Sequence, residues 1–200
     1  MKKVTIIDYG TGNILSLKRS LKYFGINPII TNSKKKIINA SHLILPGVGA
    51  FKTGMQLLNK YGLPGTLRDY VKLKKPLLGI CLGMQLLFNE SNEFGDYRGL
   101  GLIEGKVRKI SYSKLDVPII GWYKIKTHGK FLKKYNKKHM YFVHSYQALP
   151  TKKNTIKGTY KIDKENITAA VQENNIYGLQ FHPEKSSYDG LNIIKEFISL

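Results

Sequence analysis

The segment Pro76-Leu77-Leu78-Gly79-Ile80-Cys81-Leu82-Gly83-Met84-Gln85 decides the fold of this chain. Its apolar first half predicts a buried strand, and the residues after Gly83 predict the start of a helix. The only cysteine of the chain, Cys81, stands between the two with a glycine two residues away on either side. A reactive residue flanked in this way is typical of a nucleophile elbow, a strained turn that lifts the side chain out of the sheet.

Two interpretations of Cys81 are open at this point. A lone cysteine in an apolar segment is most often an inert buried residue. The alternative is a nucleophile at a helix N-terminus, where backbone N–H groups and the helix dipole favour the thiolate. A histidine and a carboxylate placed to serve the thiol would decide between these interpretations.

Short β-rich runs and amphipathic helical runs alternate through the first half of the chain. Strands are predicted over 4–8, 28–31, 42–45 and 76–80, and helices over 14–24, 33–38, 50–60 and 64–73. This order predicts an α/β fold with a central, mostly parallel sheet and helices on both faces. Ligands gather at the carboxyl ends of such strands, which is where Cys81 and the loop 46–51 would meet.

The pattern changes after about Gly99, where the β-rich runs are separated by turns only. These runs cover 105–110, 121–125, 141–145, 158–162, 168–172 and 176–181, and a last helix is predicted over 191–198. They predict an antiparallel β extension of the sheet in the C-terminal half. No internal repeat or linker is visible, so residues 1–200 are predicted to form a single domain.

The formal net charge of +20 comes from 33 Lys and Arg residues against 13 Asp and Glu residues. The excess is nearly all lysine and is spread along the chain, without the interleaved aromatic residues of a base-stacking surface. We interpret it as a solvated surface and expect no nucleic-acid partner. The alternatives are attraction of phosphate-bearing ligands or an acidic partner, and a non-catalytic nucleic-acid-binding protein.

Cysteine content and hydropathy limit the class of protein further. A single cysteine excludes an internal disulfide framework and a cysteine-based structural zinc site, and we expect neither a metal nor a cofactor. The apolar run at the N-terminus is too short for a signal peptide and is interrupted by Asp8. Since no stretch approaches the roughly 20 apolar residues of a membrane span, we expect a cytoplasmic protein without membrane contact.

His182 is the histidine best placed to serve Cys81. It follows the predicted strand 176–181 and precedes Pro183 and Glu184. Residues two apart in an extended segment project to the same side, and Pro183 would hold the backbone extended. Glu184 can then orient one imidazole nitrogen while the other faces a nucleophile, which predicts a Cys81, His182 and Glu184 triad. His42, His128 and His139 fit structural or surface positions, and His144 is ambiguous.

A thiolate that attacks a carboxamide also needs hydrogen-bond donors for the developing oxyanion. One predicted donor is the backbone N–H of Leu82, directly after the nucleophile. The other could come from Val48 or Gly49, in the loop expected at the same sheet edge. An ordinary tight turn is the alternative interpretation of that loop.

The residues together resemble the class I (triad) glutamine amidotransferases. Residues 79–85 resemble the nucleophile elbow of that family, and 180–184 its histidine–glutamate segment. Within the family, the sequence is most similar to the glutaminase subunit of imidazole glycerol phosphate synthase, whose hallmarks appear at 8–13, 45–51, 88–93, 99–103, 121–122, 142–146 and 184–186. These segments span nearly the whole chain, and the resemblance implies the class I glutamine amidotransferase fold.

The resemblance also implies a reaction. L-Glutamine would be hydrolysed to glutamate and ammonia through a thioester on Cys81, with His182 as the base and Glu184 as its orienting partner. Positions that hold glutamine in the family match Gly49, Gln85, Glu93, Ser145 and Tyr146.

A partner subunit is implied as well. In the family, ammonia passes to a (β/α)8 cyclase subunit of a heterodimer in histidine biosynthesis, and Asn13, Trp122 and Lys185 match positions facing that subunit. The peptide at Val48 can be turned away at rest in the family, which implies low activity without the partner.

One segment departs from the family pattern. Where the family usually carries Pro-His-(Ile/Met)-Gly-Trp-Asn, this chain has Pro118-Ile119-Ile120-Gly121-Trp122-Tyr123. We interpret the changes to Ile119 and Tyr123 as touching the partner side, although an aromatic residue can also fill a tolerant interface position. The alternative function is therefore a related glutaminase that supplies ammonia for amidation of an amino sugar in surface polysaccharide synthesis.

Overall fold

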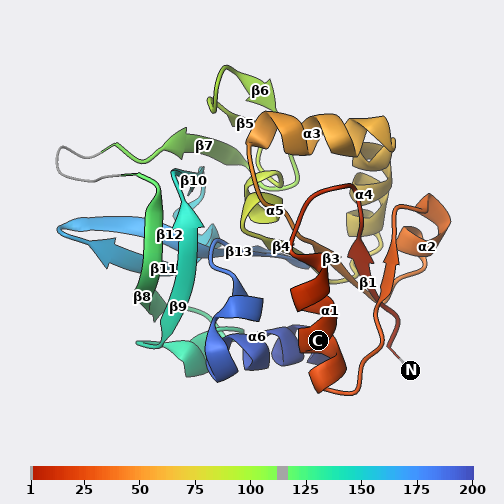
Figure 1. The fold of residues 1–200 in the computed structure, drawn as a ribbon. Coiled ribbons are helices and arrows are strands. Elements are labelled where there is room, and N and C mark those ends of the chain that lie inside the picture. The colour runs from red at the N-terminus through yellow and green to blue at the C-terminus, as the bar shows by residue number, and fades with distance from the viewer. Residues whose placement is uncertain (1, 112–116) are drawn as a thin grey trace.

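The computed structural model describes residues 2–111 and 117–200, and a nine-stranded sheet runs through its centre (Figure 1). In chain order its strands are β1 Val4–Ile7, β2 Ile29–Thr31, β3 His42–Leu45, β4 Leu77–Ile80, β8 Ile119–Thr127, β9 His139–His144, β11 Ile156–Ile162, β12 Glu165–Glu173 and β13 Ile176–Leu179. Their spatial order is β2-β1-β3-β4-β13-β12-β11-β8-β9. The helices are α1 Ile14–Tyr23, α2 Lys34–Ile38, α3 Phe51–Lys60, α4 Leu63–Lys72, α5 Leu82–Gln85 and α6 Ser187–Ser199.

The five strands β2, β1, β3, β4 and β13 are parallel to one another, and every pairing from β13 onward, through β12, β11, β8 and β9, is antiparallel. Strands β1, β3, β4 and β13 are buried along their whole length. Burial on both faces explains why these segments are mostly apolar rather than alternating between apolar and polar residues. The predicted α/β architecture, with its antiparallel extension, is confirmed.

Two hydrophobic cores lie on opposite faces of the parallel strands. Alternate residues such as Ile44 and Leu78 pack on one face with α1 and α6, and their neighbours Leu43 and Leu77 pack on the other face with α3 and α4. Figure 1 shows these helix pairs on the two sides of the sheet. This division follows from the two-residue repeat of a strand, which sends successive side chains to opposite faces.

Two sequence-based expectations for the second half and the elbow are wrong. The run 105–110 does not join the central sheet, because β7 (Gly105–Lys109) lies in a second sheet of order β10-β7-β5-β6, with β10 Tyr146–Pro150, β5 Glu90–Ser91 and β6 Tyr97–Arg98. The helix after the elbow begins at Leu82 and ends after one turn, rather than beginning at Met84. The chain then folds back through turns to β5, so the apolar residues 86–88 are buried without being helical.

The glycines on either side of Cys81 allow α5 to pack directly on the sheet. A Cβ atom on Gly83 would lie 1.9 Å from the carbonyl oxygen of Leu45, and one on Gly79 would lie 2.7 Å from the carbonyl oxygen of Gly83. Both obstacles are backbone atoms, which a side-chain rotation cannot remove. The close approach holds the elbow against the end of β3.

We expect Gly83→Ala to lower the free energy of unfolding by about 3 kcal/mol, because the added methyl group forces α5 away from β3. Urea denaturation would measure the change. The matched control is Gly65→Ala in α4, where an added Cβ meets nothing within 4 Å. That variant should be as stable as the wild type or more stable by up to about 1 kcal/mol. Equal stabilities of the two variants would contradict the steric argument.

Candidate active site

Cys81 follows the last residue of β4 and has a backbone conformation that side chains rarely adopt. Its φ is 54° and its ψ is −115°. A non-glycine residue in such a region costs on the order of 1–3 kcal/mol and persists only where the surroundings hold it. The side chain is 7% exposed. Leu82, as the first residue of α5, has no acceptor for its N–H within the helix.

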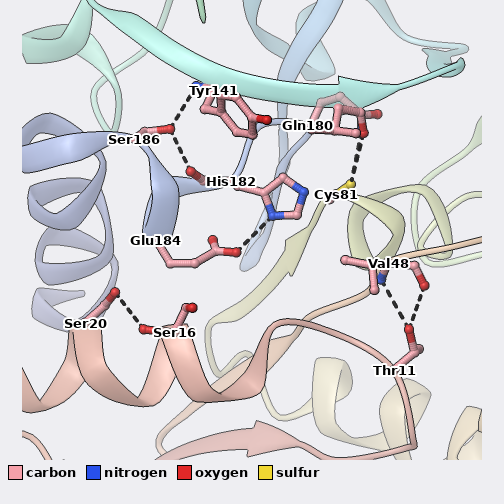
Figure 2. Close-up of polar contacts among 11 residues, drawn as sticks. Thr11, Ser16, Ser20, Val48, Cys81, Tyr141, Gln180, His182, Glu184 and Ser186 are labelled. Atoms are coloured by element: carbon pink, nitrogen blue, oxygen red, sulfur yellow. Dashed lines mark hydrogen bonds and ion pairs between the residues drawn. The ribbon is translucent and has the colours of Figure 1, made fainter. Parts of the chain in front are cut away.

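His182 reaches Cys81 because β13 is the parallel neighbour of β4. Leu179 pairs with Ile80, so the residues that follow both strands emerge at the same edge of the sheet. Nδ1 of His182 lies 2.9 Å from Oε1 of Glu184, whose side chain is 1% exposed. Figure 2 shows the imidazole between Glu184 and Cys81, with one ring nitrogen toward each.

The turn that carries Glu184 differs from the sequence-based expectation. His182 is extended, but Pro183–Lys185 forms a 3-10 turn, η3, instead of continuing the extended backbone. Ser186 closes this turn, since its hydroxyl donates to the carbonyl of His182 at 2.6 Å and accepts from the N–H of Tyr141 at 3.0 Å (Figure 2). Sequence reasoning gave Ser186 no role, because the contact with Tyr141 depends on the fold.

The charges around His182 favour its protonated form. Burial lowers the pKa of His182, but its hydrogen bonds and electrostatic contacts with Cys81 and Glu184 raise it more, to about 10. The pair is thereby suited to transfer of the thiol proton to the imidazole. This is the electrostatic arrangement that a cysteine nucleophile requires.

A cavity of about 300 Å³ opens beside the sulfur atom of Cys81. Its lining brings together most of the site residues predicted from the sequence: Val48, Gly49, Cys81, Leu82, Gln85, Glu93, Ser145, Tyr146, His182 and Lys185, joined by Pro118, Val143 and His144. Glu184 lies behind His182 rather than in the lining. Asn13 and Trp122 are not part of the lining either, and Trp122 is 50% exposed.

The Val48 backbone is held by the hydroxyl group of Thr11, a contact that sequence reasoning missed. This hydroxyl donates to the carbonyl of Val48 at 2.6 Å and accepts from its N–H at 3.4 Å (Figure 2). Thr11 is outside the cavity lining, whereas Gly49 is in it. Since a trans peptide places its N–H opposite its carbonyl, the N–H of Gly49 points away from Thr11. Of the two candidate donors, Val48 has its N–H bound by Thr11, whereas the N–H of Gly49 lies on the side of its peptide away from Thr11.

Two cavity residues are fixed by hydrogen bonds to distant backbone. Glu93 accepts a hydrogen bond of 2.6 Å from the N–H of Phe51, the first residue of α3, through one carboxylate oxygen. Burial raises the pKa of Glu93, and the Phe51 N–H opposes this shift. The amide nitrogen of Gln85 donates at 3.0 Å to the carbonyl of Tyr146. Both side chains are therefore held in place before any ligand binds.

His144, which the sequence left ambiguous, is a structural residue. Its Nδ1 lies 2.8 Å from the carbonyl of Tyr146, and its Nε2 lies 2.7 Å from the hydroxyl of Tyr160. A carbonyl only accepts, so Nδ1 carries the proton and Nε2 accepts from Tyr160. Burial lowers the pKa of His144 to about 4, although the hydrogen bond to Tyr146 opposes this. His42 is also buried and packs on Phe197, while His128 and His139 are exposed.

Residues 2–111 and 117–200 contain no group of three or more His, Cys, Asp and Glu side chains that could hold a metal ion. Within the same residues, no helix combines the length and the apolar character that crossing a membrane requires.

Residues 5–199 match the sequence model of the family described as "Glutamine amidotransferase class-I". The chain is a class I glutamine amidotransferase. The family resemblance and fold class predicted from the sequence are thus confirmed.

Relatives of this amidotransferase match over its full length. The "Imidazole glycerol phosphate synthase subunit HisH 1" of Legionella pneumophila is 37% identical, with 100% of both chains covered. The "Imidazole glycerol phosphate synthase subunit HisH" of Geobacillus kaustophilus is 38% identical, over 98% of this chain and 96% of its own. The "Imidazole glycerol phosphate synthase hisHF, chloroplastic" of Arabidopsis thaliana is 39% identical, over 98% of this chain but only 34% of its own length.

Solved structures share the fold of this amidotransferase at low sequence identity. One described as "Crystal structure of glutamine amidotransferase" has a TM-score of 0.77 at 19% identity and covers 98% of this chain and 99% of its own. The "Structure of PurLQS from Thermotoga maritima" has a TM-score of 0.76 at 19% identity, with 100% and 99% covered.

We expect Thr11→Val to lower kcat for glutamine hydrolysis about tenfold with little change in KM. Without the hydroxyl, the Val48–Gly49 peptide is free to rotate, and its N–H no longer stays beside the oxyanion. Complete removal of one such donor lowers kcat by about 10²-fold or more. Steady-state kinetics would measure this effect. Thr11→Ser keeps the hydroxyl and should retain most of the activity, so equal losses in both variants would contradict the assigned contact.

The buried, neutral His144 should make the protein less stable in acid. Its pKa in the folded state, about 4, lies below the ordinary value of 6.5. Its contribution is complete above pH 6.5 and is lost as the pH falls toward 4, because the unfolded chain then binds the proton more readily. Urea denaturation at several pH values would measure the free energy of unfolding. Between pH 6.5 and pH 4, we expect this free energy to fall by about 3 kcal/mol more in the wild type than in His144→Gln. Equal losses would contradict the prediction.

Proposed function

We propose that this amidotransferase hydrolyses L-glutamine to glutamate and ammonia through a thioester on Cys81, and delivers the ammonia to a (β/α)8 cyclase subunit. It would thus act as the glutaminase subunit of imidazole glycerol phosphate synthase, in histidine biosynthesis. The observation that carries the chemistry is the convergence of Cys81, His182 and Glu184 beside one cavity. Full-length relatives that carry this subunit's name support the pathway, and we treat residues 1–200 as one glutamine amidotransferase domain.

In the first half of the reaction, His182 accepts the thiol proton and the sulfur of Cys81 attacks the carboxamide carbon of glutamine. The negative charge that develops on the carboxamide oxygen is stabilised by the N–H groups of Leu82 and Gly49. The imidazolium of His182, held by Glu184, then gives its proton to the departing nitrogen. The C–N bond breaks, ammonia leaves, and a thioester remains on the sulfur.

In the second half, His182 accepts a proton from water, and the resulting hydroxide attacks the thioester carbon. The same two N–H groups stabilise the second oxyanion. The C–S bond breaks, glutamate leaves, and the proton returns from His182 to the sulfur of Cys81. The enzyme therefore ends in its initial protonation state, with one water consumed for each ammonia released.

The fixed polar groups of the cavity suit the amino-acid end of glutamine. Glu93 offers its free carboxylate oxygen to the α-ammonium group, since Phe51 holds the other oxygen. Gln85, Ser145 and Tyr146 line the same cavity and complete the substrate contacts that we assign. A preformed pocket of this kind orients the substrate at little entropic cost.

We assign the cyclase-facing surface to the region around η3, which contacts both α1 and β9. Asn13 directly precedes α1, Lys185 belongs to η3 itself, and Trp122 lies on β8 beside β9, where its ring packs edge-on against Tyr141. Leu15 and Ile120 are exposed on the same elements. Exposed apolar side chains on these elements fit a surface that a partner subunit covers.

The departure from the family pattern at 118–123 lies mostly in the core rather than on the partner side. Ile119 is 2% exposed and belongs to the hydrophobic core. Tyr123 is half-buried, with its ring against Phe142 and Tyr160. Burial of Ile119 corrects its assignment to the partner side, and packing on two aromatic rings accounts for Tyr123. No structural observation favours the amino-sugar pathway, and it becomes an outcome of the following experiment.

We expect glutamine hydrolysis to rise strongly when a (β/α)8 cyclase subunit and its phosphoribulosyl-formimino ribotide substrate are added. Cys81→Ala should still bind the cyclase but lose activity by about 10⁴-fold or more, because the thioester cannot form. Ammonia release and complex formation would be measured in parallel. Hydrolysis that survives Cys81→Ala would exclude the mechanism. A lack of both binding and stimulation would favour the amino-sugar pathway.

A further inference from the structure

Gln180 is a fully buried polar residue that the mechanism above does not use. It follows β13 directly and precedes Phe181 and His182. Its side chain has no exposed surface, and it is absent from the lining of the cavity. A buried carboxamide is costly unless its polar atoms are hydrogen-bonded, so the partners of Gln180 show what the fold uses it for.

The hydrogen bonds of Gln85 fix which end of the Gln180 carboxamide faces Cys81. The carbonyl of Tyr146 can only accept, so the atom of Gln85 next to it must be nitrogen. The same nitrogen donates at 3.0 Å to the side-chain oxygen of Gln180. The nitrogen of Gln180 is therefore the end directed at the sulfur of Cys81, 3.8 Å away.

The second contact of the sulfur favours the neutral thiol over the thiolate. Sγ of Cys81 lies 3.9 Å from the carbonyl oxygen of Val143, which can accept a hydrogen bond from a thiol but is repelled by a thiolate. The N–H of Gln180 donates to sulfur in either state, and a donor is worth more to a charged acceptor than to a neutral one. The hydrogen bond from Gln180 thus compensates for the repulsion between the thiolate and the Val143 carbonyl oxygen.

We propose that Gln180 is a catalytic residue whose carboxamide N–H donates to the sulfur of Cys81 and stabilises the thiolate after the proton has passed to His182. The donor is shielded from water, which strengthens the contact. Through Gln85, the same hydrogen-bond chain connects the sulfur to the wall of the substrate cavity. The role in turnover rests on the proposed glutaminase function, but the effect on the thiol does not.

The test uses alkylation of Cys81 by iodoacetamide as a function of pH. Because Cys81 is the only cysteine, the reaction reports on this thiol alone and needs neither glutamine nor the cyclase. The titratable groups around it keep their identity in every variant: His182 with Glu184 behind it, Tyr9, and the cavity residues His144, Glu93, Tyr146 and Lys185.

Gln180→Glu replaces the donor by an acceptor of almost the same shape. We expect the midpoint of the alkylation profile to move upward by about one pH unit or more, and alkylation below the midpoint to slow about tenfold for each unit. The matched control is Gln172→Glu on β12, which makes the same charge change opposite Tyr177, at the other end of β13. Its midpoint should equal that of the wild type.

Gln180→Met removes the donor without adding charge and is the second variant, should Gln180→Glu fold poorly. It should move the midpoint in the same direction by a smaller amount. If either folded variant becomes less stable to urea but keeps the wild-type midpoint, Gln180 is only structural and the proposal is wrong. In the cyclase complex, the supporting result is a lower kcat with unchanged KM. If the midpoint shifts in the variants but the wild-type protein hydrolyses no glutamine, the proposed function is wrong and the contact of Gln180 with the thiol still holds.

Discussion

The parallel pairing of β13 with β4 is the constraint on which the active site depends. The two strands come from opposite halves of the sequence, yet Gly178 lies beside Gly79 and Leu179 beside Ile80. This register sends Cys81 and His182 out of the sheet at one edge. The elbow can exist there because two glycines let α5 rest on backbone atoms of β3 and of its own turn. A larger residue at Gly79 or Gly83 would meet these backbone atoms and force α5 away from them.

Local patterns in the sequence identified the elements and the two separate segments of the predicted triad, because each of these depends on residues close together in the chain. The elbow needs a strand, two glycines and a cysteine within ten residues or so, and Glu184 is two residues from His182. Contacts that join distant segments through one hydrogen bond leave no such pattern. Thr11 with Val48, Ser186 with Tyr141 and Gln85 with Gln180 are of this kind. The second sheet was missed because its strands β5 and β6 span only two residues each and leave no strand pattern in the sequence.

Neighbouring histidines at this site have opposite electrostatic environments. His182 contacts a buried carboxylate and the sulfur, and these contacts outweigh the effect of burial on its pKa. His144 lines the same cavity but is bonded to a carbonyl and a tyrosine hydroxyl, so burial prevails and the ring stays neutral. Had His144 been charged, it would repel the imidazolium that the mechanism forms at His182. A neutral His144 therefore supports the cavity wall without competing for the proton.

The position of β13 in the sheet also has a consequence for biosynthesis of the chain. The first four strands can pair as soon as β4 has left the ribosome, but the edge of β4 then stays open until the residues of β13 are made. An open parallel edge of this kind is prone to pair with other chains, and closure over so long a separation is slow. A nascent chain at this stage holds the Cys81 thiol at that edge without His182 and Glu184 beside it. The Cys81, His182 and Glu184 cluster therefore assembles only after residues 182–184 have been made.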